Sequence, residues 1–181
     1  MEYKGRSEEE LFSFLSSKKR EDLCHDHILS SMCTLPHPVA VKAHCMFMET
    51  NLGDPGLFPG TAELEHRLVQ LFGTLFSCPD ACGYATSGGT ESNIQALRIA
   101  KSRSTSSRPN VVLPESAHFS FKKACDILCL EMRCVPLDDA FRMDLSAAEK
   151  MVDDSTCCIV GIAGGTEYGM VDPIPALSEV A

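Results

Sequence analysis

Residues 86–93, with the sequence TSGGTESN, have the composition of an anion-binding turn that leads into a helix. Gly88 and Gly89 can adopt positive φ and direct backbone N–H groups toward one point, and Thr90 occupies the position of a helix N-cap hydroxyl. The N-terminal end of the following helix carries partial positive charge, which attracts an anion to the same point. The sequence therefore predicts a phosphate site. A tight turn with an ordinary helix cap is the alternative interpretation.

This turn differs from the two common nucleotide-binding motifs. A P-loop requires a lysine that contacts the β- and γ-phosphates, and residues 86–93 contain none. The G-x-G-x-x-G spacing of a dinucleotide site is also missing from this run. The expected ligand is therefore a phosphate group that needs no lysine at this turn.

Two further loops follow expected strands, and ligand-binding residues of an open α/β sheet lie at the carboxyl ends of its strands. His118 follows an expected strand at residues 111–113 and begins a helix. Thr166 lies in a glycine-rich loop at residues 163–173, after an expected strand at 156–162. A lone histidine at a helix start is more often a surface or capping residue, so His118 is singled out by its combination with the other loops.

Composition and charge limit the classes of function. Hydrophobic residues make up 44% and charged residues 23% of the 181 positions, which is an ordinary globular balance. The net charge of −9 disfavours nucleic acid or an anionic membrane as the main partner, because such partners require a basic surface. No N-terminal segment combines the basic start, apolar core and small-residue cleavage site of a signal peptide, and no apolar run approaches about 20 residues. We expect a cytoplasmic protein that acts on small molecules.

The ten cysteines favour reduced thiols over a disulfide framework or a metal site. None of their spacings is the C-x2-C pattern of a structural zinc site. Cys125 and Cys129 fall one turn apart on an expected helix, and the adjacent Cys157 and Cys158 lie in an apolar strand, where thiols behave as small hydrophobic side chains. We therefore expect no bound metal.

Helix signals dominate the first part of the chain. Ser7 and Glu10 form a capping-box pattern that begins a helix, a second helix follows Pro38, and a third spans about residues 62–76. Residues 51–60 include five glycines or prolines, which predict an irregular loop. Residues 1–60 are expected to form an N-terminal helical segment with an active-site loop.

Strands and helices alternate in the remainder of the chain. Strands are expected at 111–113, 132–135 and 156–162, and helices at about 119–130 and 145–152. This alternation predicts an α/β fold with a mostly parallel sheet and helices on both faces. A last helix begins near Pro173 without a C-cap signal after it. Residues 61–181 are therefore expected to be the first part of a larger domain, truncated before its end.

Residues 87–93, 117–120 and 161–169 together closely resemble the pyridoxal-phosphate-dependent group II amino-acid decarboxylases. Residues 31–38 and 51–58 also resemble the N-terminal region of the archaeal branch that acts on L-tyrosine or L-aspartate. The resemblance covers nearly the whole chain. It implies the N-terminal part of the large domain of a fold-type I transferase, with pyridoxal 5′-phosphate (PLP) as the cofactor.

The resemblance also implies a role for each motif. The cofactor phosphate would be held by Gly88, Gly89 and Thr90. His118 would stack on the pyridine ring, and Thr166 would contact the ring or its substituents.

Two residues earlier in the chain are candidates for the substrate side of the site. They are His37, which lies between two prolines, and Asn51, which begins the irregular loop. A role for His37 as a simple helix-entry residue is the alternative. Asp172, after the glycine-rich loop, is assigned no chemistry.

The activity implied for the complete protein is conversion of L-tyrosine to tyramine or of L-aspartate to β-alanine, amines used in methanofuran and coenzyme A synthesis. The family implies a homodimer with active sites at the subunit interface. The lysine that forms the Schiff base and the aspartate that pairs with the pyridinium nitrogen have no matching position in this chain. Lys122 and Lys123 are expected to be solvated charges. This segment alone is therefore expected to be inactive.

Two alternatives stay open. The same cofactor could serve another lyase reaction, as in sphingosine-phosphate lyases or cysteine desulfurases. The chain could also be a non-catalytic phosphate-binding fragment.

Overall fold

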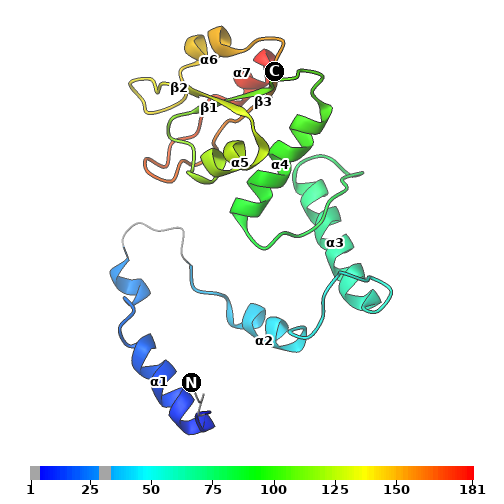
Figure 1. Ribbon diagram of the computed structural model, residues 1–181, viewed down its shortest axis with the longest axis vertical. Coiled ribbons are helices and arrows are strands. Elements are labelled where there is room, and N and C mark those ends of the chain that lie inside the picture. The colour runs from blue at the N-terminus through cyan, green and yellow to red at the C-terminus, as the bar shows by residue number, and fades with distance from the viewer. Residues whose placement is uncertain (1–4, 29–33) are drawn as a thin grey trace. The chain divides into compact units, whose positions relative to one another are not determined.

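The structure is a computed structural model that describes residues 5–28 and 34–181 (Figure 1). Contacts between Cα atoms divide the chain into two units, Met1–Glu49 and Thr50–Ala181. The boundary expected after residue 60 stays a prediction. The part of the predicted N-terminal motif at residues 31–33, which includes Cys33, lies outside the described residues.

The first unit contains α1 (Glu8–Lys19), a short 3-10 helix (His25–His27) and α2 (Pro38–Met46). The predicted capping box of α1 is confirmed, because the Ser7 side chain accepts from the Glu10 N–H and the Glu10 carboxylate accepts from the Ser7 N–H. Three acidic residues in its first turn and two lysines in its last turn complement the helix dipole.

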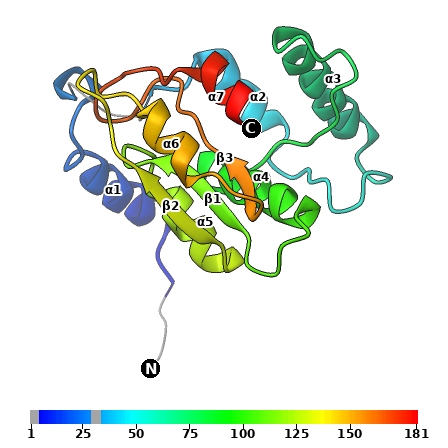
Figure 2. The ribbon, with the colours of Figure 1, turned by 90° about the horizontal axis from the view of Figure 1, so that it is seen from above.

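The second unit contains a three-stranded parallel sheet (Figure 2). The strands are β1 (Asn110–Pro114), β2 (Glu131–Val135) and β3 (Thr156–Ile159), in the order β2-β1-β3. Val111 pairs with Met132 of β2 and with Cys158 of β3. Every residue of the central strand β1 is buried, as expected of a strand with neighbours on both sides and helices on both faces.

Helices cover both faces of the sheet, as predicted (Figure 1). One face packs against α4 (Gly89–Arg103) and α5 (Ser120–Leu128), and the other packs against α6 (Leu145–Met151) and α7 (Ile174–Val180). Alternate residues of β1 enter the two core clusters, with Val111 and Leu113 on the α4–α5 side and Val112 on the other. No described helix is both long and apolar enough to cross a membrane.

The remaining helix of the second unit is α3 (Pro59–Leu75), which confirms the helix predicted at about 62–76. It begins with proline in its first turn, where a missing N–H is tolerated. The preceding segment is an irregular loop, as predicted. Within it the Asn51 and Asp54 side chains accept hydrogen bonds from the Gly53 and Gly56 N–H groups.

Three local predictions are wrong. The N-cap of α4 is Gly88 rather than Thr90, which lies inside the helix, because the helix begins earlier than the hydroxyl pattern suggested. The left-handed backbone expected at Gly88 and Gly89 is not found there, and Gly88 has an extended φ of 162°. Among the described glycines, Gly164 and Gly169 have φ in the left-handed region. Strand β3 ends at Ile159 rather than residue 162, because the Ile162 N–H donates to the Asp172 carboxylate instead of a neighbouring strand.

Candidate functional site

The first turn of α4 offers several N–H groups to an external acceptor. The first hydrogen bond of the helix runs from the Ser92 N–H to the Gly88 carbonyl, and the N–H groups of Gly89, Thr90 and Glu91 have no acceptor within the described residues. A Cβ at Gly88 or Gly89 would meet no atom within 4 Å, so the space in front of the turn is open. These features fit an anion such as a phosphate group.

Hydrogen bonds from side chains shape this turn. The Glu91 carboxylate accepts from both the N–H and the hydroxyl of Ser87, at 2.9 and 2.5 Å. The hydroxyl bond and then the N–H bond lower the pKa of Glu91. The Thr86 hydroxyl lies 3.2 Å from the Gly88 carbonyl and 2.6 Å from the Ser92 hydroxyl. These hydrogen bonds hold the turn without using the free N–H groups of Gly89, Thr90 and Glu91.

His118 lies in the loop between β1 and α5, as predicted, and its Nδ1 atom is fixed by Ser120. The Ser120 N–H donates to Nδ1 at 3.2 Å, and the Ser120 hydroxyl lies 2.9 Å from the same atom. The Asn93 amide donates to the Ser120 hydroxyl oxygen at 2.8 Å, whereas the backbone N–H of Ser120 donates to Nδ1. Nδ1 is thus an acceptor, and a neutral His118 carries its proton on Nε2.

Asn93 and Ser120 were not among the predicted site residues. They connect the two predicted motifs directly, because Asn93 lies near the start of α4 and Ser120 begins α5. The sequence signal was present in the Asn at the end of the TSGGTESN run and in the His-x-Ser pattern. That Asn93 and Ser120 form a hydrogen bond could not be predicted from this signal, because the bond depends on the packing of α4 beside α5.

Helices α4 and α5 run in the same direction. The Asn93–Ser120 bond joins their N-terminal parts, and the Lys101 ammonium donates to the Leu128 carbonyl near their C-terminal ends. Both N-termini therefore lie at the edge of the sheet where β1 ends. This arrangement brings the Gly88 turn and His118 together at that edge, with the partial positive charges of two helix ends.

Thr166 is exposed in a loop after β3, at the same edge of the sheet because β1 and β3 are parallel. Hydrogen bonds from the Gly165 N–H to the Met170 carbonyl and from the Gly169 N–H to the Gly165 carbonyl shape the loop. Asp172 is 5% exposed, and its two carboxylate oxygens accept from the Met143 and Ile162 N–H groups at 2.8 Å each. Asp172 thus has a structural role, consistent with the absence of assigned chemistry.

The two substrate-side candidates make local hydrogen bonds. His37 is the N-cap of α2, and its Nδ1 accepts from the Val39 N–H at 3.2 Å. The Asn51 side-chain oxygen accepts from the Gly53 N–H. A substrate role for either residue stays a prediction.

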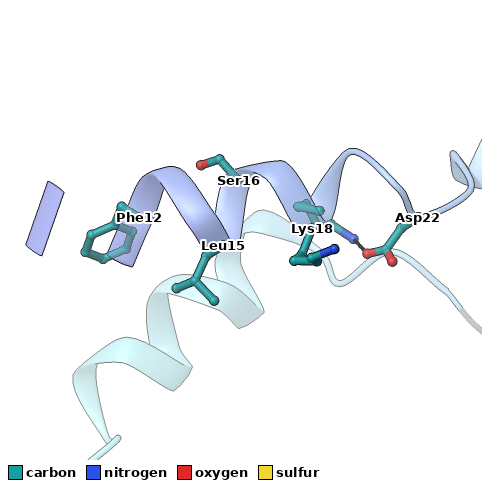
Figure 3. A pocket seen from close by; sticks show the side chains of 6 residues that line it. Phe12, Leu15, Ser16, Lys18 and Asp22 are labelled. Atoms are coloured by element: carbon teal, nitrogen blue, oxygen red, sulfur yellow. Dashed lines mark hydrogen bonds and ion pairs between the residues drawn. The ribbon is translucent and has the colours of Figure 1, made fainter. Parts of the chain in front are cut away.

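A hollow in the first unit contains none of the predicted site residues (Figure 3). It has a volume of about 440 Å³ and is lined by six residues of α1 and the turn after it, namely Phe12, Leu15, Ser16, Lys18, Lys19 and Asp22. The Lys19 ammonium pairs with the Asp22 carboxylate at 2.8 Å on its rim.

The nine described cysteines are free, and the described residues contain no group of three potential metal ligands. Burial raises the pKa of Cys158 to about 11, which keeps this thiol protonated at neutral pH. Lys122 and Lys123 are exposed on α5, as predicted.

Comparison with known proteins identifies close relatives. The chain is 66% identical over 178 residues to a probable L-tyrosine/L-aspartate decarboxylase of Methanosphaerula palustris, covering 98% of this chain and 49% of the relative. The chain spans about half the length of the curated relatives it matches.

Solved structures agree in fold. Glutamate decarboxylase of Lactobacillus brevis superposes with a TM-score of 0.82 at 27% identity, covering 99% of this chain and 45% of that one. Sphingosine-1-phosphate lyase of Burkholderia pseudomallei has the same TM-score of 0.82 at 25% identity, covering 100% and 46%. The conserved domain of the pyridoxal-dependent decarboxylases matches residues 39–181. The chain therefore belongs to the pyridoxal-dependent decarboxylase family, whose cofactor is PLP.

Proposed function

We propose that this chain supplies the phosphate-binding and ring-stacking part of the active site of a PLP-dependent amino-acid decarboxylase. The observation that supports this most strongly is the hydrogen-bonded series Asn93–Ser120–His118, because it joins the open turn of α4 to the imidazole at one edge of the sheet. An anion site and an oriented aromatic ring next to it match the two ends of PLP.

The phosphate group would accept hydrogen bonds from the free N–H groups of Gly89 and Thr90, with Gly88 leaving room for its approach. His118 would stack on the pyridine ring. Phe119 lies against the imidazole, with ring centroids 4.1 Å apart and planes tilted by 37°, which leaves the opposite face of the imidazole for the cofactor. Thr166 would contact the ring or its substituents from the loop after β3.

When bound, PLP supplies an electron sink for the electrons released as the amino acid loses CO2. The residues of this chain bind and orient the cofactor. We propose that covalent attachment uses a lysine other than Lys122 and Lys123, because both side chains are exposed to solvent in the first turn of α5.

The proposed substrate of the complete protein is L-tyrosine or L-aspartate, as in the names of the relatives. The proposed assembly is a homodimer, as the family resemblance implies. A second candidate is another PLP-dependent lyase reaction, favoured by the likeness to sphingosine-1-phosphate lyase. Product analysis on a full-length protein that contains this chain separates them. Tyramine or β-alanine with CO2 supports decarboxylation, whereas an aldehyde from C–C cleavage contradicts it.

The phosphate site is tested by a charge placed at Gly88. An Asp or Asn side chain fits there, since the φ of Gly88 is extended and its Cβ position is open, and both residues are good N-caps. Both variants compete with phosphate for the N–H groups, but only Asp repels it. We expect Gly88→Asp to bind PLP about tenfold more weakly than Gly88→Asn in equilibrium titrations.

Equal PLP affinities for Gly88→Asp and Gly88→Asn would contradict the site. A companion experiment mixes the chain with PLP, reduces it with borohydride and maps the peptides. We expect PLP binding that inorganic phosphate weakens and no stoichiometric adduct at one lysine. A stoichiometric adduct on Lys122 or Lys123 would mean that covalent attachment uses this segment.

A further inference from the structure

The turn between β2 and α6 contacts the loop that carries Thr166 at two places. The Phe141 ring stacks on Tyr168 near the tip of the loop, with centroids 4.6 Å apart and planes 23° apart. The Met143 N–H donates to the Asp172 carboxylate at the base of the loop. Two contacts at opposite ends restrict the loop more than either contact alone.

Phe141 has a φ of 59°, in the left-handed region that a bulky side chain seldom adopts. Such a conformation persists only where the surrounding structure enforces it. Here the Asp138 side chain enforces the conformation of Phe141. One carboxylate oxygen accepts hydrogen bonds from the N–H groups of Ala140 and Arg142, and the other accepts from Nε and Nη2 of Arg142. The Phe141 N–H also donates to the Asp138 carbonyl.

These hydrogen bonds make the turn a rigid support for one exposed ring. The Arg142 N–H and then its guanidinium hold the pKa of Asp138 below the usual value, so the support is charged and intact at neutral pH. Phe141 is 52% and Tyr168 49% exposed, so the stack contributes little to the core of the unit. The stack joins the turn to the Thr166 loop.

We propose that Phe141 is a positioning residue, and that its stacking on Tyr168 holds the loop at residues 163–171 in the conformation in which Thr166 faces the cofactor site. The positioning of the loop is supported by the Phe141–Tyr168 stack and the Met143–Asp172 hydrogen bond. Its relevance to the cofactor rests on the proposed function, through the role of Thr166.

The test measures amide hydrogen exchange at Gly165 and Gly169, whose N–H groups are bonded within the loop. We expect Phe141→Ala and Tyr168→Ala each to speed exchange at these amides by about two- to tenfold. Amides of the buried part of α4 should be unaffected. The double variant should exchange no faster than the faster single variant, because the two side chains act through one contact.

Three controls separate the ring from other causes. Phe141→Tyr keeps the ring and should keep the protection. Phe141→Gly accepts the positive φ but lacks the ring, so it should lose protection as Phe141→Ala does. Phe76→Ala removes a different aromatic pair, on α3, and should leave the loop unchanged.

Unchanged exchange in Phe141→Ala, retained protection in Phe141→Gly, or multiplied effects in the double variant would each overturn the proposal. Titrations with PLP and with inorganic phosphate then address function separately. A loss of PLP affinity with unchanged phosphate affinity supports both ideas. Faster loop exchange with unchanged PLP affinity supports the positioning and contradicts the role proposed for Thr166.

Discussion

Ser120 is the residue through which the two main motifs of the site are joined. It is fully buried, its hydroxyl accepts from Asn93, and both its N–H and its hydroxyl contact His118. A side chain with several partners in a buried position is sensitive to truncation, because each partner loses its hydrogen bond at once.

We expect Ser120→Ala to lower the free energy of unfolding by about 1–3 kcal/mol, because the Asn93 amide is left without its acceptor. It should also weaken PLP binding, since His118 loses one of the two groups that orient it. Urea unfolding and PLP titration measure these effects. Ser102→Ala removes an exposed hydroxyl bond to the Ile99 carbonyl on α4 and should change neither. Equal behaviour of the two variants would contradict the role of Ser120.

Asp153 has its pKa lowered to about 2, first by the Arg133 guanidinium and then by the Asn110 amide and the Ser155 N–H. A folded-state pKa below the unfolded value stabilises the fold above the unfolded pKa, and the contribution is lost as the pH falls through the folded pKa. The loss should therefore occur between about pH 4 and pH 2.

Urea unfolding of the wild type and Asp153→Asn at several acidic pH values measures this dependence. The difference in stability between them should shrink as the pH falls through that window. Asp154→Asn, at the exposed neighbouring position, is the control. A difference that stays constant from pH 5 to pH 2 would show that the charge of Asp153 does not contribute.

Helix α3 ends in a close approach that depends on one glycine. Gly73 is the buried residue of this helix, and a Cβ there would lie 2.5 Å from the Cys78 carbonyl oxygen and 2.9 Å from the Ala81 Cβ. The Cys78 N–H in turn donates to the Gly73 carbonyl at 2.7 Å. The chain after α3 therefore folds back onto the helix at this point.

We expect Gly73→Ala to destabilise the second unit by about 1–3 kcal/mol, because backbone atoms must shift to admit the methyl group. Gly60→Ala in the first turn of the same helix meets no atom within 4 Å and should be neutral or stabilising by up to about 1 kcal/mol. Thermal unfolding of both variants checks the prediction. A stable Gly73→Ala variant would mean that the segment at residues 78–81 is not packed against α3 in this way.

At the scale of the whole second unit, Asp172 connects elements that are distant in the sequence. Its carboxylate joins the end of the β3 segment at Ile162 to Met143 before α6, and it is buried. Both oxygens act as acceptors, so a charged carboxylate suits this position better than an amide.

We expect Asp172→Asn to lower the free energy of unfolding by about 1–3 kcal/mol, because an amide has one acceptor and leaves one N–H group unpaired. Asp139→Asn, at an exposed position of the turn between β2 and α6, is the matched control. Urea unfolding of both variants tests the structural role of Asp172. A loss of stability in Asp139→Asn alone would contradict that role.

Much of the second unit could be predicted from its sequence, because β1 and β3 are short, largely apolar runs and the helices show apolar periodicity. Strand β1 and helices α5 and α6 were each predicted to within a few residues. The errors occurred where a side chain from a distant position takes over a backbone group. Strand β3 is the example, since the Asp172 carboxylate binds the Ile162 N–H and ends the strand early.

The sequence by itself determined the class of fold and the family, and it indicated the segments that we propose hold the cofactor, because glycines, prolines and periodic apolar residues act locally. Only the tertiary structure decided how these segments meet. The parallel packing of α4 and α5 joins Asn93 to Ser120, and the turn after β2 places Phe141 on Tyr168. Neither contact has a local signature, because each depends on the relative placement of elements that are separated along the chain.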